Sequence, residues 1–72
     1  MDLNLREAIR NNMQGSDEGQ IRATIIDAIQ SGEEKMLPGL GVLFEMVWDQ
    51  AEQGIRDEMV HCIKLSLDQE KG

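Results

Sequence analysis

Residues 27–48 read DAIQSGEEKMLPGLGVLFEMVW, and this stretch decides the fold. A helix is expected to end at Gly32, because glycine adopts positive φ without strain. A short acidic turn follows, and Pro38 then fits the first position of a new helix, where a missing backbone N–H costs nothing. The residues after Pro38 are almost wholly apolar. The stretch therefore predicts two packed helices joined by a turn, and it contains no recognisable catalytic motif.

Apolar residues recur at three- and four-residue intervals along the chain, a spacing that predicts helices and no strands. We expect an all-α single domain, a small bundle of four short helices, at residues 5–13, 17–31, 39–52 and 55–68. A chain of 72 residues is near the size at which one core barely suffices. Homodimerisation would complete the bundle. The fourth helix is predicted to turn these side chains inward: Ile55, Met59, Cys62, Ile63 and Leu67.

Polar residues mark where the first two helices are expected to begin. Asn4 is predicted to cap the first helix, with Glu7 reaching back in a capping box. Ser16 is predicted to cap the second helix, after Gly15 has ended the first. The polar turn from Ser31 to Leu37 leaves room for a single helical turn.

The third helix carries apolar residues on more than one side. Its broad inward face is predicted to hold Leu40, Leu43, Phe44, Val47, Trp48 and Ala51. Val42 and Met46 fall on the opposite side, where a monomer would leave them in water. Two interpretations stay open: isolated exposed apolar residues are common, or this side joins a homodimer contact. The second interpretation gives a self-association surface of Leu37, Val42, Met46 and Trp48.

The chain is acidic, with 7 basic and 14 acidic residues and a net charge of −7. The basic residues are scattered, so phosphate backbones and anionic membrane surfaces would be repelled. We therefore expect no membrane partner and no nucleic-acid partner, unless assembly forms a basic face. The N-terminal stretch lacks the apolar core of a signal peptide. Cys62 is the only cysteine, which rules out an internal disulfide and fits a reducing compartment.

Three arrangements could be mistaken for active sites. Glu58 and His61 have the spacing of di-iron helices, yet both fall on the solvent side of the fourth helix. The glycines of residues 37–41 lack the lysine and the preceding strand of a phosphate loop. His61 and Cys62 point about 100° apart and cannot act as base and nucleophile. The sequence therefore predicts no enzyme activity, no cofactor and no metal.

Residues 3–6 (LNLR) and 24–45 (TIIDAIQSGEEKMLPGLGVLFE) resemble the small acid-soluble spore protein I family of endospore-forming bacteria. The similarity spans most of the chain and is looser beyond Asp49. The resemblance implies a minor protein made in the forespore and held in the spore core. It implies no catalytic residues. The major α/β-type acid-soluble spore proteins, which coat spore DNA, are a separate family whose helical segments this chain lacks.

Two hypotheses about function follow. The first is a non-enzymatic structural or interaction protein of the spore core that forms a homodimer through its third helix. The alternative is a DNA-associated spore protein that uses a basic face formed on assembly.

Overall fold

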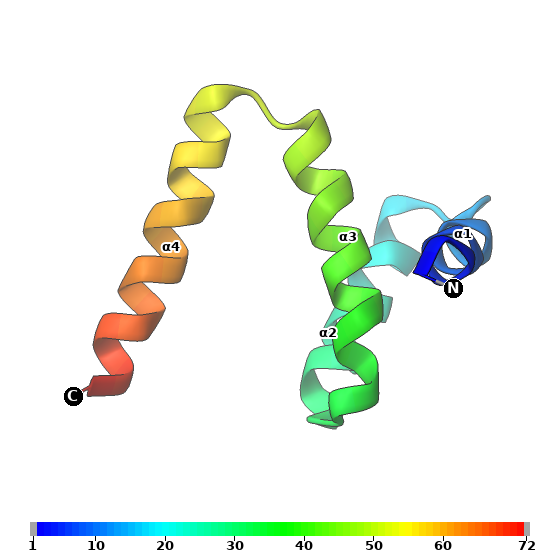
Figure 1. Ribbon diagram of the computed structural model, residues 1–72, viewed down its shortest axis with the longest axis horizontal. Coiled ribbons are helices and arrows are strands. Elements are labelled where there is room, and N and C mark those ends of the chain that lie inside the picture. Colours follow the sequence, from blue (N-terminus) through cyan, green and yellow to red (C-terminus); the bar gives the residue numbers. More distant parts are fainter. Residues whose placement is uncertain (1, 72) are drawn as a thin grey trace.

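The computed structural model describes residues 2–71 and builds them mainly from helices (Figure 1). No strand occurs in that range, which confirms the predicted all-α class with four helices. The elements in chain order are α1 (Asp2–Met13), α2 (Glu18–Ser31), the 3₁₀ turn η1 (Glu34–Met36), α3 (Leu37–Gln50) and α4 (Gln53–Lys71). The turn η1 fills the place where the sequence left room for one helical turn.

The start of α2 differs from the prediction by one residue. Asp17, and not Ser16, is the N-cap: its Oδ1 accepts the backbone N–H of Gln20 at 2.8 Å. The Gln20 Oε1 accepts the backbone N–H of Asp17 at 3.0 Å, which completes a capping box. Asp17 forms the cap because Gln20, three residues later, has a side chain that can accept a hydrogen bond from the Asp17 backbone. The residue three positions after Ser16 is Gly19, which has no such side chain.

The other helix ends follow local chemistry closely. Gly15 and Gly32 both adopt positive φ, at 83° and 67°, and terminate α1 and α2 as predicted. Pro38 lies in the first turn of α3. The capping box predicted at Asn4 is wrong, because α1 already begins at Asp2 and Asn4 lies inside the helix.

The interior lies between α1, α2 and α3. Leu43 and Leu40 of α3, Ile9 of α1 and Ala28 of α2 line a shared hollow of about 410 Å³. Among the residues whose burial is described, Val42 is the only one with less than a tenth of its surface in water. The three helices therefore pack loosely, with most apolar side chains only partly removed from water.

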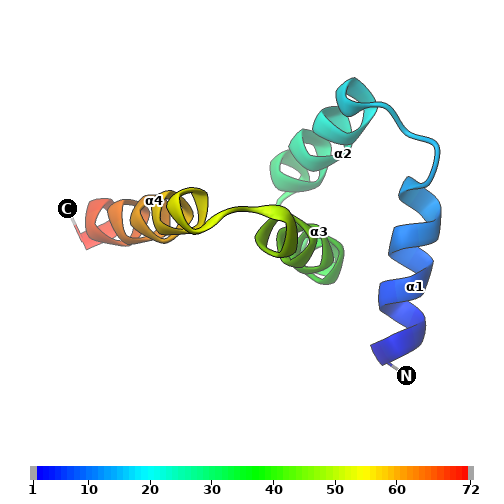
Figure 2. The same cartoon turned by 90° about the horizontal axis from the view of Figure 1, so that it is seen from above.

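α4 stands apart from this group. Figures 1 and 2 show α1 and α4 on opposite sides of α3, with α4 meeting α3 only near the connecting residues 51–52. From 53 to 70, only Arg56 and Met59 are even half-buried. The prediction that α4 turns Ile55, Cys62, Ile63 and Leu67 inward is therefore wrong for this arrangement, because no helix lies over that stripe.

Candidate interaction surface

One of the four residues predicted for self-association lies under α1. Val42 is 7% exposed, and it shares a hollow with Leu5 and Arg6 of α1. The predicted exposure of Val42 is therefore wrong. The physical reason is that α3 is apolar on nearly every side, so its sequence does not reveal which side its neighbours cover.

An ion pair fastens α1 over the same side of α3. Arg6 Nε and one terminal nitrogen of Arg6 each donate to a separate Glu45 carboxylate oxygen at 2.8 Å. Such a bidentate pair fixes orientation as well as position. The hydrogen bond from Arg6, with its positive charge, lowers the pKa of Glu45 below the usual 4.5, against a smaller opposing effect of desolvation.

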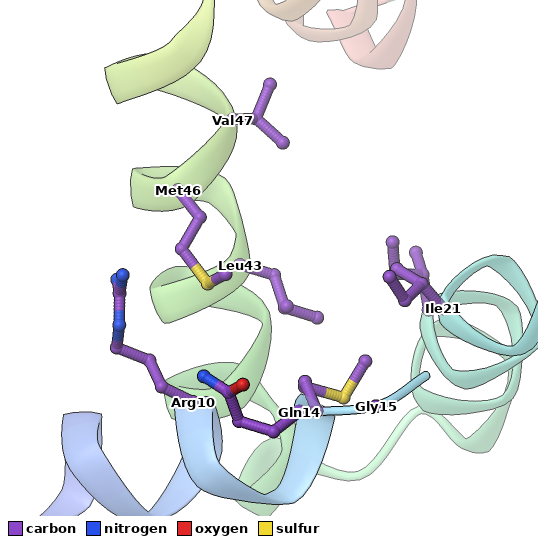
Figure 3. A pocket seen from close by; sticks show the side chains of 9 residues that line it. Arg10, Gln14, Gly15, Ile21, Leu43, Met46 and Val47 are labelled. Atoms are coloured by element: carbon purple, nitrogen blue, oxygen red, sulfur yellow. The ribbon is translucent and has the colours of Figure 1, made fainter. Parts of the chain in front are cut away.

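Met46 borders an apolar groove formed by three helices (Figure 3). The groove has a volume of about 310 Å³ and contains Leu43 and Val47 of α3 with Ile21 of α2. Arg10, near the end of α1, stands at its edge. Met46 is half-buried there, whereas the sequence predicted that a monomer would leave it exposed to water.

Leu37 and Trp48 lie on a different side of α3. Leu37 is 60% exposed. Trp48 is half-buried, and its ring centroid lies 6.0 Å from that of Phe44, which is 43% exposed. At 100° per residue, Phe44 lies about 160° from Val42 around the helix. The structure therefore splits the four predicted residues, with Val42 and Met46 toward α1 and α2 and the other two on the open side.

Arg56 of α4 contacts the end of α3 where the two helices join. Its Nε donates to the backbone carbonyl of Trp48 at 2.9 Å. Its guanidinium carbon lies 5.4 Å from the centroid of the Trp48 ring, a cation–π geometry. The carbonyl belongs to the last turn of α3, which lacks a helical partner for it. Arg56 therefore links the two helices at their joint.

Sequence reasoning missed the exposed apolar side of α4. Met59, Val60, Ile63 and Leu67 fall within about 100° of one another around the helix. Arg56 lies in the same sector and reaches α3, so this side of α4 turns toward α3. We call the apolar residues on these sides of α3 and α4 the elbow surface: Phe44, Trp48, Met59, Val60, Ile63 and Leu67. The periodic pattern is visible in the sequence, but it predicts an inward face of the bundle and does not show that α4 stands apart.

The basic side chains do not gather on one face. Lys64 pairs with Asp68 at 3.0 Å and Lys35 with Glu33 at 3.5 Å. Arg6 pairs with Glu45 and Arg56 lies over Trp48. In the described part of the chain, these cations therefore meet carboxylates or an aromatic ring.

Titratable side chains do not converge on a chemical site in the described residues. Glu58 and His61 are both exposed on α4, as their spacing predicted. No three His, Cys, Asp or Glu side chains between residues 4 and 70 lie close enough together to hold a metal ion. Within the same range, no helix has the length and apolar character needed to cross a bilayer.

These features define a small helical protein whose most notable surface is apolar and open. The family model of the small, acid-soluble spore protein I matches residues 3–67. The chain belongs to this family, which confirms the resemblance carried by residues 3–6 and 24–45.

Curated relatives cover nearly the whole chain. The small, acid-soluble spore protein I of Halalkalibacterium halodurans is 55% identical over 67 residues, which are 93% of this chain and 98% of the relative. The protein of the same name from Bacillus subtilis is 55% identical, covering 93% of this chain and 94% of its own. A Bacillus cereus relative is 51% identical, covering 93% and 97%. No solved structure matches the chain.

Proposed function

We propose that this chain is a non-enzymatic structural or interaction protein of the spore core that acts through self-association. The exposed apolar side chains carry the proposal. Large apolar residues with more than two-fifths of their surface in water include Leu37 and Phe44 on α3 and five residues of α4. Scattered apolar residues need no explanation, but a contiguous apolar surface marks an interaction site.

Placement in the spore core is supported by membership of a spore protein family. It is tested by removing the coats from dormant spores and then rupturing the core. The protein is expected to stay with the decoated spores and to be released only on rupture. Recovery with the coat fraction would contradict core placement.

The non-enzymatic assignment is supported by the dispersion of the chemistry-bearing side chains. Glu58, His61 and Cys62 are all exposed on one helix, where neighbours point apart and no opposing element supplies a third group. The family description names a spore protein and no reaction.

Self-association is tested by static light scattering on the full chain. The mass is expected to rise with concentration from 8.1 kDa toward twice that value. Replacing Phe44 by Glu serves as a first probe and should lower the measured mass, since this side chain is 43% exposed and its loss should not unfold the monomer. A wild-type chain that stays monomeric at high micromolar concentration would refute the proposal.

The DNA-associated alternative has no support in the placement of the basic side chains. Lys35 and Lys64 each pair with a carboxylate, and the net charge is −7. A gel shift at low salt tests it directly, because phosphate contacts are strongest there. No binding is expected.

A further inference from the structure

We infer that two copies of this chain bind each other through the elbow surface, with α4 of each copy packed against α3 of the other. This inference rests on the proposed self-association and names the surface that performs it. The partner is a second copy of the chain. Three observations carry it: the excess surface, the position of the apolar sector on α4, and the linkage at Arg56.

The chain exposes far more surface than a compact monomer of its mass. Its accessible surface is 6097 Å². A folded monomer of 8.1 kDa is expected to expose about 4,500 Å². The excess is therefore about 1,600 Å² per copy, and a standard interface takes only about 800 Å² from each partner. A standard interface would therefore remove about half of the excess, and removing all of it takes about 3,200 Å² in total, a size that obligate homodimers reach.

The exposed side of α3 and the apolar sector of α4 face the same space. α1 covers α3 on the side of Val42, so Phe44 and Trp48 look the other way. Arg56 marks the side of α4 that turns toward α3. Figure 1 shows the two helices diverging from their joint.

The sector of α4 is suited to burial. Between Gln53 and Leu67 it holds Met59, Val60, Ile63 and Leu67, and the two carboxylates of that span, Asp57 and Glu58, fall outside it. Burying an unpaired carboxylate is costly. Glu70 falls within the sector near the end of α4, and on α3 Glu45 and Asp49 line the same hollow as Phe44 and Trp48. These carboxylates belong at the rim of the contact, where water still reaches them.

The chain's own α4 is held away from α3. Only residues 51 and 52 connect the two helices. Arg56 occupies the joint, with its hydrogen bond to the Trp48 carbonyl and its guanidinium over the Trp48 ring. Folding α4 back onto its own α3 would have to displace this side chain from the joint, whereas a helix from a second copy can approach α3 from outside the joint.

Two exposed residues of α4 provide a matched pair of variants for the test. Ile63 is 48% exposed and lies in the elbow surface, whereas Leu65 is 45% exposed and lies about 160° away around the helix. We expect Ile63→Glu to raise the dimer dissociation constant at least about tenfold, because it places a charge in the contact. Leu65→Glu should leave that constant within about threefold. Both constants are measured by sedimentation equilibrium on full-length protein, with circular dichroism to confirm the helix content.

The sole tryptophan and the sole cysteine give a second readout. One preparation carries Cys62→Ser and keeps Trp48 on α3 as the donor. The other carries Trp48→Phe and an acceptor dye on the exposed Cys62 of α4. Mixing the two should produce energy transfer from Trp48 to the dye, and Ile63→Glu in both preparations should shift this transfer to higher protein concentration.

The outcomes separate this inference from the proposed function. A dimer weakened equally by Ile63→Glu and Leu65→Glu, or a dimer without transfer in the mixture, would overturn the elbow contact and leave self-association standing. A monomer would overturn both.

Discussion

At the scale of single residues, Val42 marks which side of α3 is the inside. It is 7% exposed, whereas Val47, on the same helix, is 48% exposed. Both are valines in one helix, so replacing either by alanine changes the helical propensity of the chain by the same amount. A difference between the two variants therefore reports burial alone.

We predict that Val42→Ala lowers the free energy of unfolding by about 1–2 kcal/mol more than Val47→Ala does. Chemical denaturation followed by circular dichroism measures both. Equal losses, or a larger loss for Val47→Ala, would show that the buried side of α3 has been assigned wrongly.

Glu45 makes the stability dependent on pH. Its pKa is lowered in the folded protein, first by the hydrogen bond from Arg6 and then by the charge of Arg6. A lowered folded pKa means that the unfolded chain binds the proton more readily. The contribution of the pair is therefore complete above the unfolded pKa and is lost as the pH falls through the folded pKa.

Glu45→Gln should accordingly destabilise the protein at neutral pH and should lose its effect in acid. The expected observation is a gap between wild-type and variant melting temperatures that narrows as the pH is lowered below 4.5. Glu58→Gln, at an exposed residue of α4, serves as the control. A gap that stays constant down to strongly acidic pH would exclude the pair as its source.

At the scale of elements, local chemistry sets the ends of the helices. Asp17 and Gln20 cap α2 reciprocally, and Ser16 stands next to them without making the cap. Removing a capping oxygen costs about 1 kcal/mol. Asp17→Ala should therefore reduce the free energy of unfolding by about that amount. Ser16→Ala should reduce it clearly less, and the reverse order in denaturant titrations would restore Ser16 as the cap.

Two glycines should respond to alanine in opposite directions. Gly41 lies inside α3 with no atom within 4 Å of an added Cβ, so Gly41→Ala should stabilise by about 0.5–1 kcal/mol. Gly32 has φ of 67°, where a side chain is strained, so Gly32→Ala should destabilise by about 1 kcal/mol. Thermal melts of both variants check this pair. Stabilisation by both would mean that Gly32 is not held in the left-handed conformation.

These elements also show what the sequence could and could not predict. Gly15, Gly32 and Pro38 act through their own backbones, so the order and type of the helices could be predicted from them. The orientation of α3 could not, because apolar residues surround it and only its neighbours decide which side is covered. The position of α4 could not either, since the apolar stripe of Met59 and Ile63 suits an internal core and an external partner equally well.

The same distinction applies to the predicted surface residues. Leu37 and Trp48 lie on the open side of α3. The sequence periodicity instead predicted that Val42 and Met46 would be the solvent-exposed apolar residues of this helix. Arg56 was not singled out in advance, because its role depends on a carbonyl eight residues earlier that the joint brings within reach. The only signal for this role in the sequence is that Arg56 is a basic residue in the first turn of α4, just after the break between α3 and α4.

At the scale of the whole molecule, the fold divides into a loosely packed group of α1, α2 and α3 and an α4 that lacks a partner in its own chain (Figures 1 and 2). The surface in excess of a compact monomer, about 1,600 Å², connects this shape to self-association. A small chain with a marginal core gains stability when a second copy covers its apolar residues. Its melting temperature should then rise with protein concentration.

Sedimentation equilibrium of the full-length chain, from low to high micromolar concentration, tests the central claim most directly. The account predicts a reversible transition from the 8.1 kDa monomer to a species of twice that mass, with Ile63→Glu shifting the transition to higher concentration. A single 8.1 kDa species across the whole range would contradict it.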